Sequence, residues 1–199
     1  MRRGERWALL GKNGAGKTTL LSLILADNPQ SYANPITLFG RKRGSGESIW
    51  EIKRSIGWVS PELHIYYQQA VSLLDVVCSG FSDSVGFAHA SSKDQVLIAK
   101  RWIEALGLDL PFETQFSDLS AGQQRLALLA RALVKNPPML ILDEPCQALD
   151  EVHRAHFLQL LDRLCALTPL TLIYVTHLKG EIPSAITHQL RLEGGKILV

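Results

Sequence analysis

The sequence lacks the features that would mark a secreted, metal-knotted or membrane-spanning protein. Its only cysteines are Cys78, Cys146 and Cys165, without a C-x-x-C spacing, which argues against a disulfide framework or a zinc knot and favours a reducing compartment. No apolar run approaches the roughly 20 residues that a membrane-spanning helix needs, and the first residues lack the apolar stretch of a signal peptide. We therefore expect a cytoplasmic protein, or one bound peripherally at the inner face of the plasma membrane through other chains.

The chain also lacks a strong excess of charge of either sign. Lys and Arg number 21 against 19 Asp and Glu, so the formal net charge is +2, and bulk electrostatics does not indicate a nucleic-acid partner. The composition is 46% apolar and 20% charged, which is typical of a globular domain rather than of a disordered chain. A length of 199 residues suits one domain, or one domain with an inserted lobe.

Short apolar runs alternate with helical patterns along the chain, and this alternation predicts an α/β domain with a mostly parallel sheet. The run at 139–142 is apolar throughout, as expected of a strand buried on both faces. Residues 63–135 are mostly helical in pattern, which predicts a lobe inserted into a core of about 1–62 and 136–199. The predicted strands are 7–10, 36–39, 56–59, 139–142 and 170–175, the predicted helices are 17–26, 94–107, 123–135 and 152–167, and a hairpin is predicted around 193–195.

Residues 40–48 contain three basic residues among glycines and serines, Arg41, Lys42 and Arg43. The composition predicts a polar loop. The basic side chains either contact phosphate or are simply solvated, and we favour solvation.

A phosphate-binding pattern, G-x-x-x-x-G-K-[ST], lies between a predicted strand and a predicted helix. Glycines let backbone N–H groups surround phosphate oxygens, and the helix that begins near Lys17 points its positive dipole end at the same anion. Lys17 is expected to bridge the terminal phosphates, and the Thr18 hydroxyl to hold Mg²⁺. The predicted binding residues are Gly11, Lys12, Asn13, Gly14, Ala15, Gly16, Lys17, Thr18 and Thr19.

Three motifs further along admit a structural as well as a chemical interpretation. Asp143 and Glu144 follow a buried strand, where they are either solvated acids or a Mg²⁺ partner and a group that orients or deprotonates water. Ser120 is either an ordinary helix N-cap or, with the amides that follow it, a second anion-binding helix start. His177 follows the last apolar strand and is either a satisfied buried side chain or part of the site.

The order of these motifs resembles that of the ABC-type ATPases, from residue 4 to the end of the chain. The resemblance implies a P-loop NTPase fold of the ABC type over residues 1–199, with ATP and Mg²⁺ as ligands and ATP hydrolysis as the activity. It also implies that a second ABC domain closes head to tail on this one around two nucleotides. The family's signature is Leu-Ser-Gly-Gly-Gln, and this chain carries Ala121 in its third place.

The same resemblance suggests a role for each motif. Lys17, Glu144 and His177 would be catalytic, and Thr18 and Asp143 would hold Mg²⁺. Ser120, Gly122 and Gln123 would bind the nucleotide of the second domain, and Asp150 matches a loop aspartate that crosses between the domains.

A closer resemblance is to the ModF-type, or photorepair-type, ATP-binding proteins. It is carried by the segments 27–30, 38–41, 44–47 and 120–125. Members of that family usually have two ABC domains in one polypeptide without membrane spans, and this chain resembles the second domain. The family is linked by name to molybdate transport.

Two departures from the ABC pattern stand out. The domain normally begins about two strands earlier, with an aromatic residue that stacks on adenine, so the N-terminal antiparallel strands are expected to be missing here, either because this is a fragment or because they come from elsewhere. Base stacking is worth about 1–3 kcal/mol, so nucleotide affinity would be lower by about tenfold or more. The glutamine that follows the third strand is also absent from its usual place, where Glu62 lies instead, with Gln68 and Gln69 further on.

Three purposes are compatible with these motifs. The domain drives a partner such as a membrane permease for molybdate, another oxyanion or a metal. Alternatively, it belongs to a soluble twin-domain ATPase that acts on a macromolecule in repair or translation. In the third case it is a regulatory module that binds nucleotide without hydrolysis. The ModF resemblance and the absent glutamine argue against the permease, whereas the presence of Glu144 and His177 places the non-hydrolysing module last.

Overall fold

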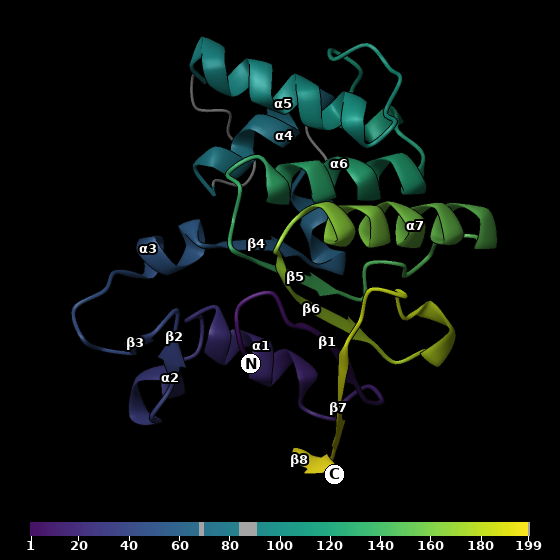
Figure 1. Ribbon diagram of the computed structural model, residues 1–199. Helices are drawn as coiled ribbons and strands as arrows, with labels where there is room; N and C mark the ends of the chain where they lie inside the picture. Colours follow the sequence, from purple (N-terminus) through teal and green to yellow (C-terminus); the bar gives the residue numbers. More distant parts are fainter. Residues whose placement is uncertain (68–69, 84–90, 199) are drawn as a thin grey trace.

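A computed structural model describes residues 1–67, 70–83 and 91–198, so Gln68 and Gln69 lie outside the described residues. Within these ranges a six-stranded sheet has the order β4-β5-β6-β1-β7-β8 (Figure 1). Neighbouring strands are parallel except for the terminal pair β7 and β8. The sheet therefore confirms the predicted α/β fold. Its strands are β1 (Arg6–Leu10), β4 (Ile56–Val59), β5 (Met139–Asp143), β6 (Thr171–Thr176), β7 (His188–Glu193) and β8 (Lys196–Leu198).

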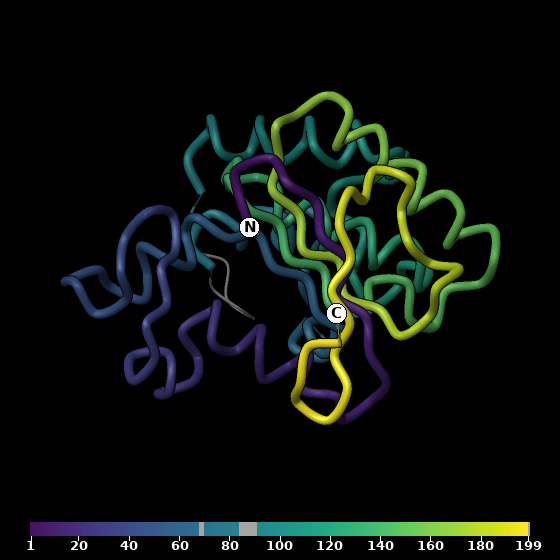
Figure 2. The backbone as a smooth tube through the Cα atoms, turned by 60° about the horizontal axis from the view of Figure 1, so that its bottom comes forward, coloured from purple at the N-terminus to yellow at the C-terminus, as the bar shows by residue number. Residues whose placement is uncertain are grey.

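Helices cover both faces of the sheet, which explains why its central strands β5 and β6 are mostly apolar and buried. On β5, Leu140 and Leu142 belong to one buried cluster and Ile141 to the other. The first cluster includes residues of α6 (Ala121–Leu133) and α7 (Glu151–Leu167), and the second includes residues of α1 (Lys17–Ile24) and α3 (Ile49–Arg54). Figures 1 and 2 show the α1 and α7 segments on opposite sides of the sheet.

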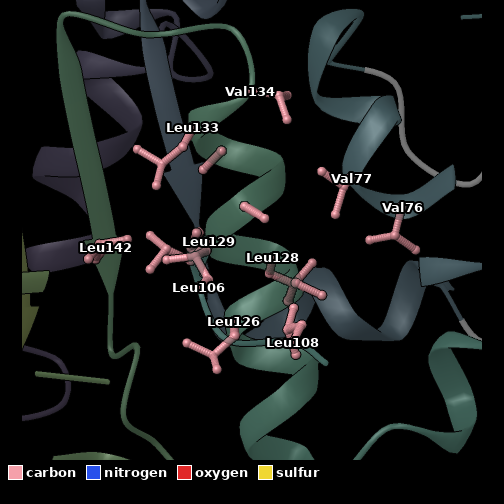
Figure 3. Packing of buried hydrophobic residues seen from close by; sticks show 14 of the residues in the cluster. Val76, Val77, Leu106, Leu108, Leu126, Leu128, Leu129, Leu133, Val134 and Leu142 are labelled. Carbon is pink, nitrogen blue, oxygen red and sulfur yellow. The ribbon is translucent and has the colours of Figure 1, made fainter. Parts of the chain in front are cut away.

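The mostly helical region between β4 and β5 is organised around α6, against which its other helices pack. Its other helices are α4 (Leu73–Cys78) and α5 (Lys93–Ala105), with short 3₁₀ turns at Pro61–Tyr67, Ser79–Phe81 and Phe116–Asp118. Figure 3 shows Leu128 of α6 beside Val76 and Val77 of α4, with Leu142 of β5 across the helix. Because one buried cluster joins this region to the sheet, the lobe limits of about 63 and 135 stay a prediction.

The stretch predicted as one polar loop is partly ordered, and that prediction is wrong for its first residues. Arg41–Lys42 forms β3, which pairs antiparallel with β2 (Thr37–Leu38). Arg43 is 5% exposed, and its guanidinium carbon lies 5.4 Å from the centre of the Tyr32 ring. The hairpin thus turns one basic side chain inward.

Two short helices around this hairpin were not predicted, α2 (Gln30–Ala33) and α3. For α3 the sequence did carry a signal, because Ser48 and Glu51 have the S-x-x-E spacing of a capping box. Both hydrogen bonds of that box are present in the structure.

The sequence argued against a disulfide framework and against a membrane-spanning helix, and the described residues bear on both. Cys78, Cys146 and Cys165 are buried free thiols. Across the described ranges, no helix combines the length and the apolar character needed to cross a bilayer.

Candidate functional site

The phosphate-binding pattern forms a loop at the carboxyl edge of the parallel strands. It connects β1 to α1, and β1 lies between β6 and β7 in the sheet. Gly16 is the N-cap of α1 with φ 102°, and Gly14 has φ 80°. Side chains rarely tolerate such values, so glycine is required for the loop to turn its backbone inward.

The ammonium group of Lys17 lies inside this loop. The residue is 7% exposed, and its Nζ donates to the carbonyl oxygens of Gly11 at 2.7 Å and Lys12 at 3.3 Å. It also lies 3.6 Å from Glu144 Oε1. The positive charge is therefore held at the centre of the loop, where phosphate oxygens could replace the carbonyl acceptors.

Glu144 and His177 meet because the strands that precede them are neighbours. Glu144 follows β5 and His177 follows β6, and His177 Nδ1 lies 2.8 Å from Glu144 Oε2. Glu144 has φ 46°, a left-handed conformation that strains a residue with a side chain, and such strain often accompanies functional sites. Its backbone N–H donates to the Val175 carbonyl at 3.0 Å, which fixes the acid beside the histidine.

Lys17 and Glu144 line one cleft of about 380 Å³, together with Asp143 and with Glu62 from a further segment. Glu62, from the 3₁₀ turn after β4, reaches the cleft as the sequence allowed, whereas Pro61 and Gln147 were not expected. None of Arg41, Lys42 and Arg43 is among its lining residues. The lining comprises Lys12, Asn13, Gly14, Ala15, Gly16, Lys17, Thr18, Thr19, Pro61, Glu62, Asp143, Glu144 and Gln147.

Gly11 and His177 line an adjoining hollow of about 260 Å³ that shares the loop residues 12–15 with the cleft. Lys179 and Arg191 also line this hollow. Sequence patterns did not single out either cation, since each is an isolated basic residue.

Asp143 lies where its negative charge is unfavourable. Burial, reinforced by Glu144 and Glu62 and opposed by Lys17, raises the pKa of Asp143 from 3.8 to about 6. A cation at this point would relieve the repulsion among the three carboxylates.

Magnesium fits the donors in this cleft. Among the described residues, no three His, Cys, Asp or Glu side chains are grouped so as to hold a metal by themselves. Mg²⁺ at nucleotide sites, however, takes only one or two protein oxygens together with waters and phosphates. Thr18 and Asp143 both line the cleft and supply a hydroxyl and a carboxylate of that kind.

The pKa of Asp143 leads to a stability prediction. Between pH of about 4 and 6 the folded state binds a proton that the unfolded state releases, so stability falls as the pH rises through this window. We expect Asp143→Asn to raise the melting temperature by about 2–4 °C at pH 8 and hardly at all below pH 4. Thermal unfolding without nucleotide or Mg²⁺ measures this. The exposed Asp109→Asn is the control, and an equal gain at all pH values would contradict the prediction.

The predicted signature residues lie at the start of α6, away from this cleft. Ser120 is the N-cap, as predicted. Its Oγ accepts from the Gln123 backbone N–H at 3.3 Å, and its own N–H donates to Gln123 Oε1 at 2.9 Å. Gly122 is buried and Ser120 is exposed. The structure therefore does not bring Ser120, Gly122 and Gln123 to the cleft of their own chain.

Comparison with known proteins identifies one family and several relatives that this chain resembles. Residues 1–147 match the family model described as ABC transporter. The chain is 47% identical over 195 residues to the ABC transporter ATP-binding protein ModF of Escherichia coli (strain K12), which covers 96% of this chain and 40% of ModF. The chain thus spans about two fifths of the length of that relative.

Solved structures share the fold. The cbiO1 protein of Clostridium perfringens, described as part of the ABC transporter complex cbiONQ, is 25% identical with a TM-score of 0.83, covering 100% of this chain and 77% of that one. A dimer of the ATP-binding cassette MJ0796, in a post-hydrolysis state bound to ADP and Pi, is 24% identical with a TM-score of 0.78, covering 99% and 84%.

Proposed function

Because the chain belongs to the ABC transporter family of ATP-binding domains, we propose that it binds ATP with Mg²⁺ in the phosphate-loop cleft and hydrolyses the ATP to ADP and phosphate. The observation that carries this proposal is a chain of contacts that joins the cleft to the hollow beside it. Lys17 Nζ lies 3.6 Å from one oxygen of Glu144, and His177 lies 2.8 Å from the other. The three residues to which we assign phosphate binding, proton acceptance and orientation of the attack thus lie in contact with one another.

Binding would use the loop amides and the positive end of α1 for the phosphate oxygens. Lys17 would exchange the carbonyls of Gly11 and Lys12 for oxygens of the terminal phosphates. Thr18 and Asp143 would hold Mg²⁺, which when bound neutralises charge on the phosphates.

Hydrolysis would proceed by attack of water on the γ-phosphorus, with cleavage of the bond to the oxygen that leaves with ADP. Glu144 would accept the proton of the water. Its Oε1 is buried without a hydrogen-bond partner among the described residues, so this oxygen can accept from water once Lys17 turns to the phosphates. His177 would hold the other oxygen of Glu144 and orient the attack.

Two domains would be needed for each active site. Ser120 and Gly122 lie at a capped helix start outside the cleft of their own chain, and the MJ0796 cassette is a dimer in its complex with ADP and Pi. We therefore propose that a second copy of this chain, or another ABC domain, closes head to tail so that each signature helix meets the nucleotide held by the other domain.

The dimer makes ATP hydrolysis depend on protein concentration. In dilute solution the rate per molecule should rise about in proportion to concentration, and it should level off once the domains are paired. Measuring phosphate release over a hundredfold range of concentration tests this. A constant rate per molecule from a monomer would overturn the dimer but not the ATPase, whereas no release at any concentration would overturn the hydrolysis.

A partner would receive the closing motion at the turn Pro61–Tyr67. Its first residues, Pro61 and Glu62, line the cleft, whereas Ile65 and Tyr66 are 51% and 60% exposed. An apolar surface is therefore joined directly to the nucleotide site. The absent glutamine argued against a permease, but Glu62 in its place lines the cleft beside this exposed surface. Since the ModF relative is named as an ABC transporter ATP-binding protein, we propose a membrane permease as the partner class.

A further inference from the structure

We propose that His153 is a positioning residue that fixes the start of α7 to the start of α6, so that Asp150 and the signature segment face the second domain as one rigid unit. The inference rests on the proposed function, because it gives His153 a role on the face where the two domains would close. His153 is the third residue of α7 (Glu151–Leu167), and neither the cleft nor the proposed hydrolysis uses it.

The first contact is with Asp150, the N-cap of α7. The His153 backbone N–H donates to Asp150 Oδ1 at 2.9 Å, and the ring Nδ1 lies 2.6 Å from Oδ2. Since a carboxylate only accepts, Nδ1 carries the proton. These bonds, led by the backbone one, lower the pKa of Asp150. One residue therefore holds both carboxylate oxygens and sets the direction of an exposed side chain.

The second contact is with Gly122 on the other helix. A Cβ placed on Gly122 would lie 2.5 Å from His153 Cδ2 and 3.0 Å from Cγ. The imidazole therefore lies directly against the Gly122 backbone. It cannot swing away without breaking its hydrogen bond to Asp150. Glycine at position 122 is thus favoured by packing within one chain for as long as Asp150 holds the ring in this position.

A third contact connects this unit to the chain's own cleft. Arg125 is 8% exposed, and its guanidinium donates to the Gln147 carbonyl at 3.5 Å, the outer limit of a hydrogen bond. Gln147 lines the cleft three residues after Glu144. A movement at the start of α6 would therefore reach the segment that follows the proposed base Glu144 at two points, through Arg125 at Gln147 and through His153 at Asp150.

A cycle of substitutions tests the contact in the single chain. Gly122→Ala should lower the urea midpoint of unfolding, because the new methyl group collides with the held ring. In the His153→Ala background the same change should leave the midpoint unchanged or raise it, since alanine favours a helix over glycine. Equal losses in both backgrounds would overturn the contact.

A second measurement tests the positioning role. In a Glu144→Gln background with ATP and Mg²⁺, His153→Ala should weaken dimerisation by about tenfold, the effect of losing one charge-assisted hydrogen bond. His153→Asn should restore most of the affinity, because its amide can still donate to Asp150. His156→Ala changes an exposed histidine of the same helix and should have no effect. Sedimentation equilibrium measures all three.

The outcomes separate the two proposals. If Glu144→Gln dimerises and His153→Ala dimerises equally well, His153 has no positioning role and the inference fails while the dimer stands. If Glu144→Gln itself remains monomeric, the dimer proposal fails and the role of His153 fails with it, even where the unfolding cycle shows the contact with Gly122.

Discussion

Lys17→Ala is expected to weaken ATP binding by about a hundredfold or more. The ammonium is buried in the loop and donates to two of its carbonyls, so it is already directed at the point where phosphates would lie. Its loss removes charge-assisted hydrogen bonds of about 1.5–3 kcal/mol each. It also leaves Glu144 without the cation 3.6 Å away, which adds repulsion towards a triphosphate. Isothermal titration with ATP and Mg²⁺ measures the change.

A matched control distinguishes loss of the site from a general loss of positive charge. Lys93 is an exposed lysine in the first turn of α5, and Lys93→Ala should bind ATP like the unchanged protein. Circular dichroism verifies that both variants remain folded. An unaltered affinity in folded Lys17→Ala would show that the loop is not the phosphate site.

Glu144→Gln should slow hydrolysis by about 10²–10⁴-fold, the usual contribution of a general base, without weakening ATP binding. The amide has nearly the shape of the carboxylate and can still receive a hydrogen bond from His177, but it cannot take a proton from water. ATP then persists between two domains, so dimers should accumulate. Phosphate release and light scattering with ATP and Mg²⁺ measure the two effects.

The double variant Lys17→Ala/Glu144→Gln serves as the control, because it should bind too little ATP to close. It should stay monomeric under conditions that pair the single Glu144→Gln variant. Equal dimerisation of both variants would show that pairing does not depend on nucleotide. Normal turnover in Glu144→Gln would remove Glu144 from the proposed mechanism.

Local patterns were sufficient for the phosphate loop and for the longer helices α1, α6 and α7 beside the sheet. Gly14 and Gly16 adopt the backbone angles that the glycine pattern predicts, and Ser120 caps α6 as expected. The start of α6 is two residues earlier than the apolar pattern indicated, because the capping box with Gln123 defines it. Such features depend on neighbours within a few residues, which a sequence displays directly.

Contacts between distant segments could not be predicted in this way. The Glu144 and His177 pair depends on β5 lying next to β6, and the sequence suggested it only through family resemblance. The packing of His153 on Gly122 had no signal, since an exposed histidine in a helix is ordinary. Arg43 was expected among solvated residues and is buried, because the β2–β3 hairpin turns it towards Tyr32.

The position of β1 has a consequence for how the protein is made. β1, which leads into the phosphate loop, pairs with β6 on one side and β7 on the other, and both come from the last third of the chain. During synthesis the supporting strands follow the loop only after more than a hundred further residues. Until β6 and β7 are made, both edges of β1 lack their pairing partners, and unpaired strand edges favour aggregation.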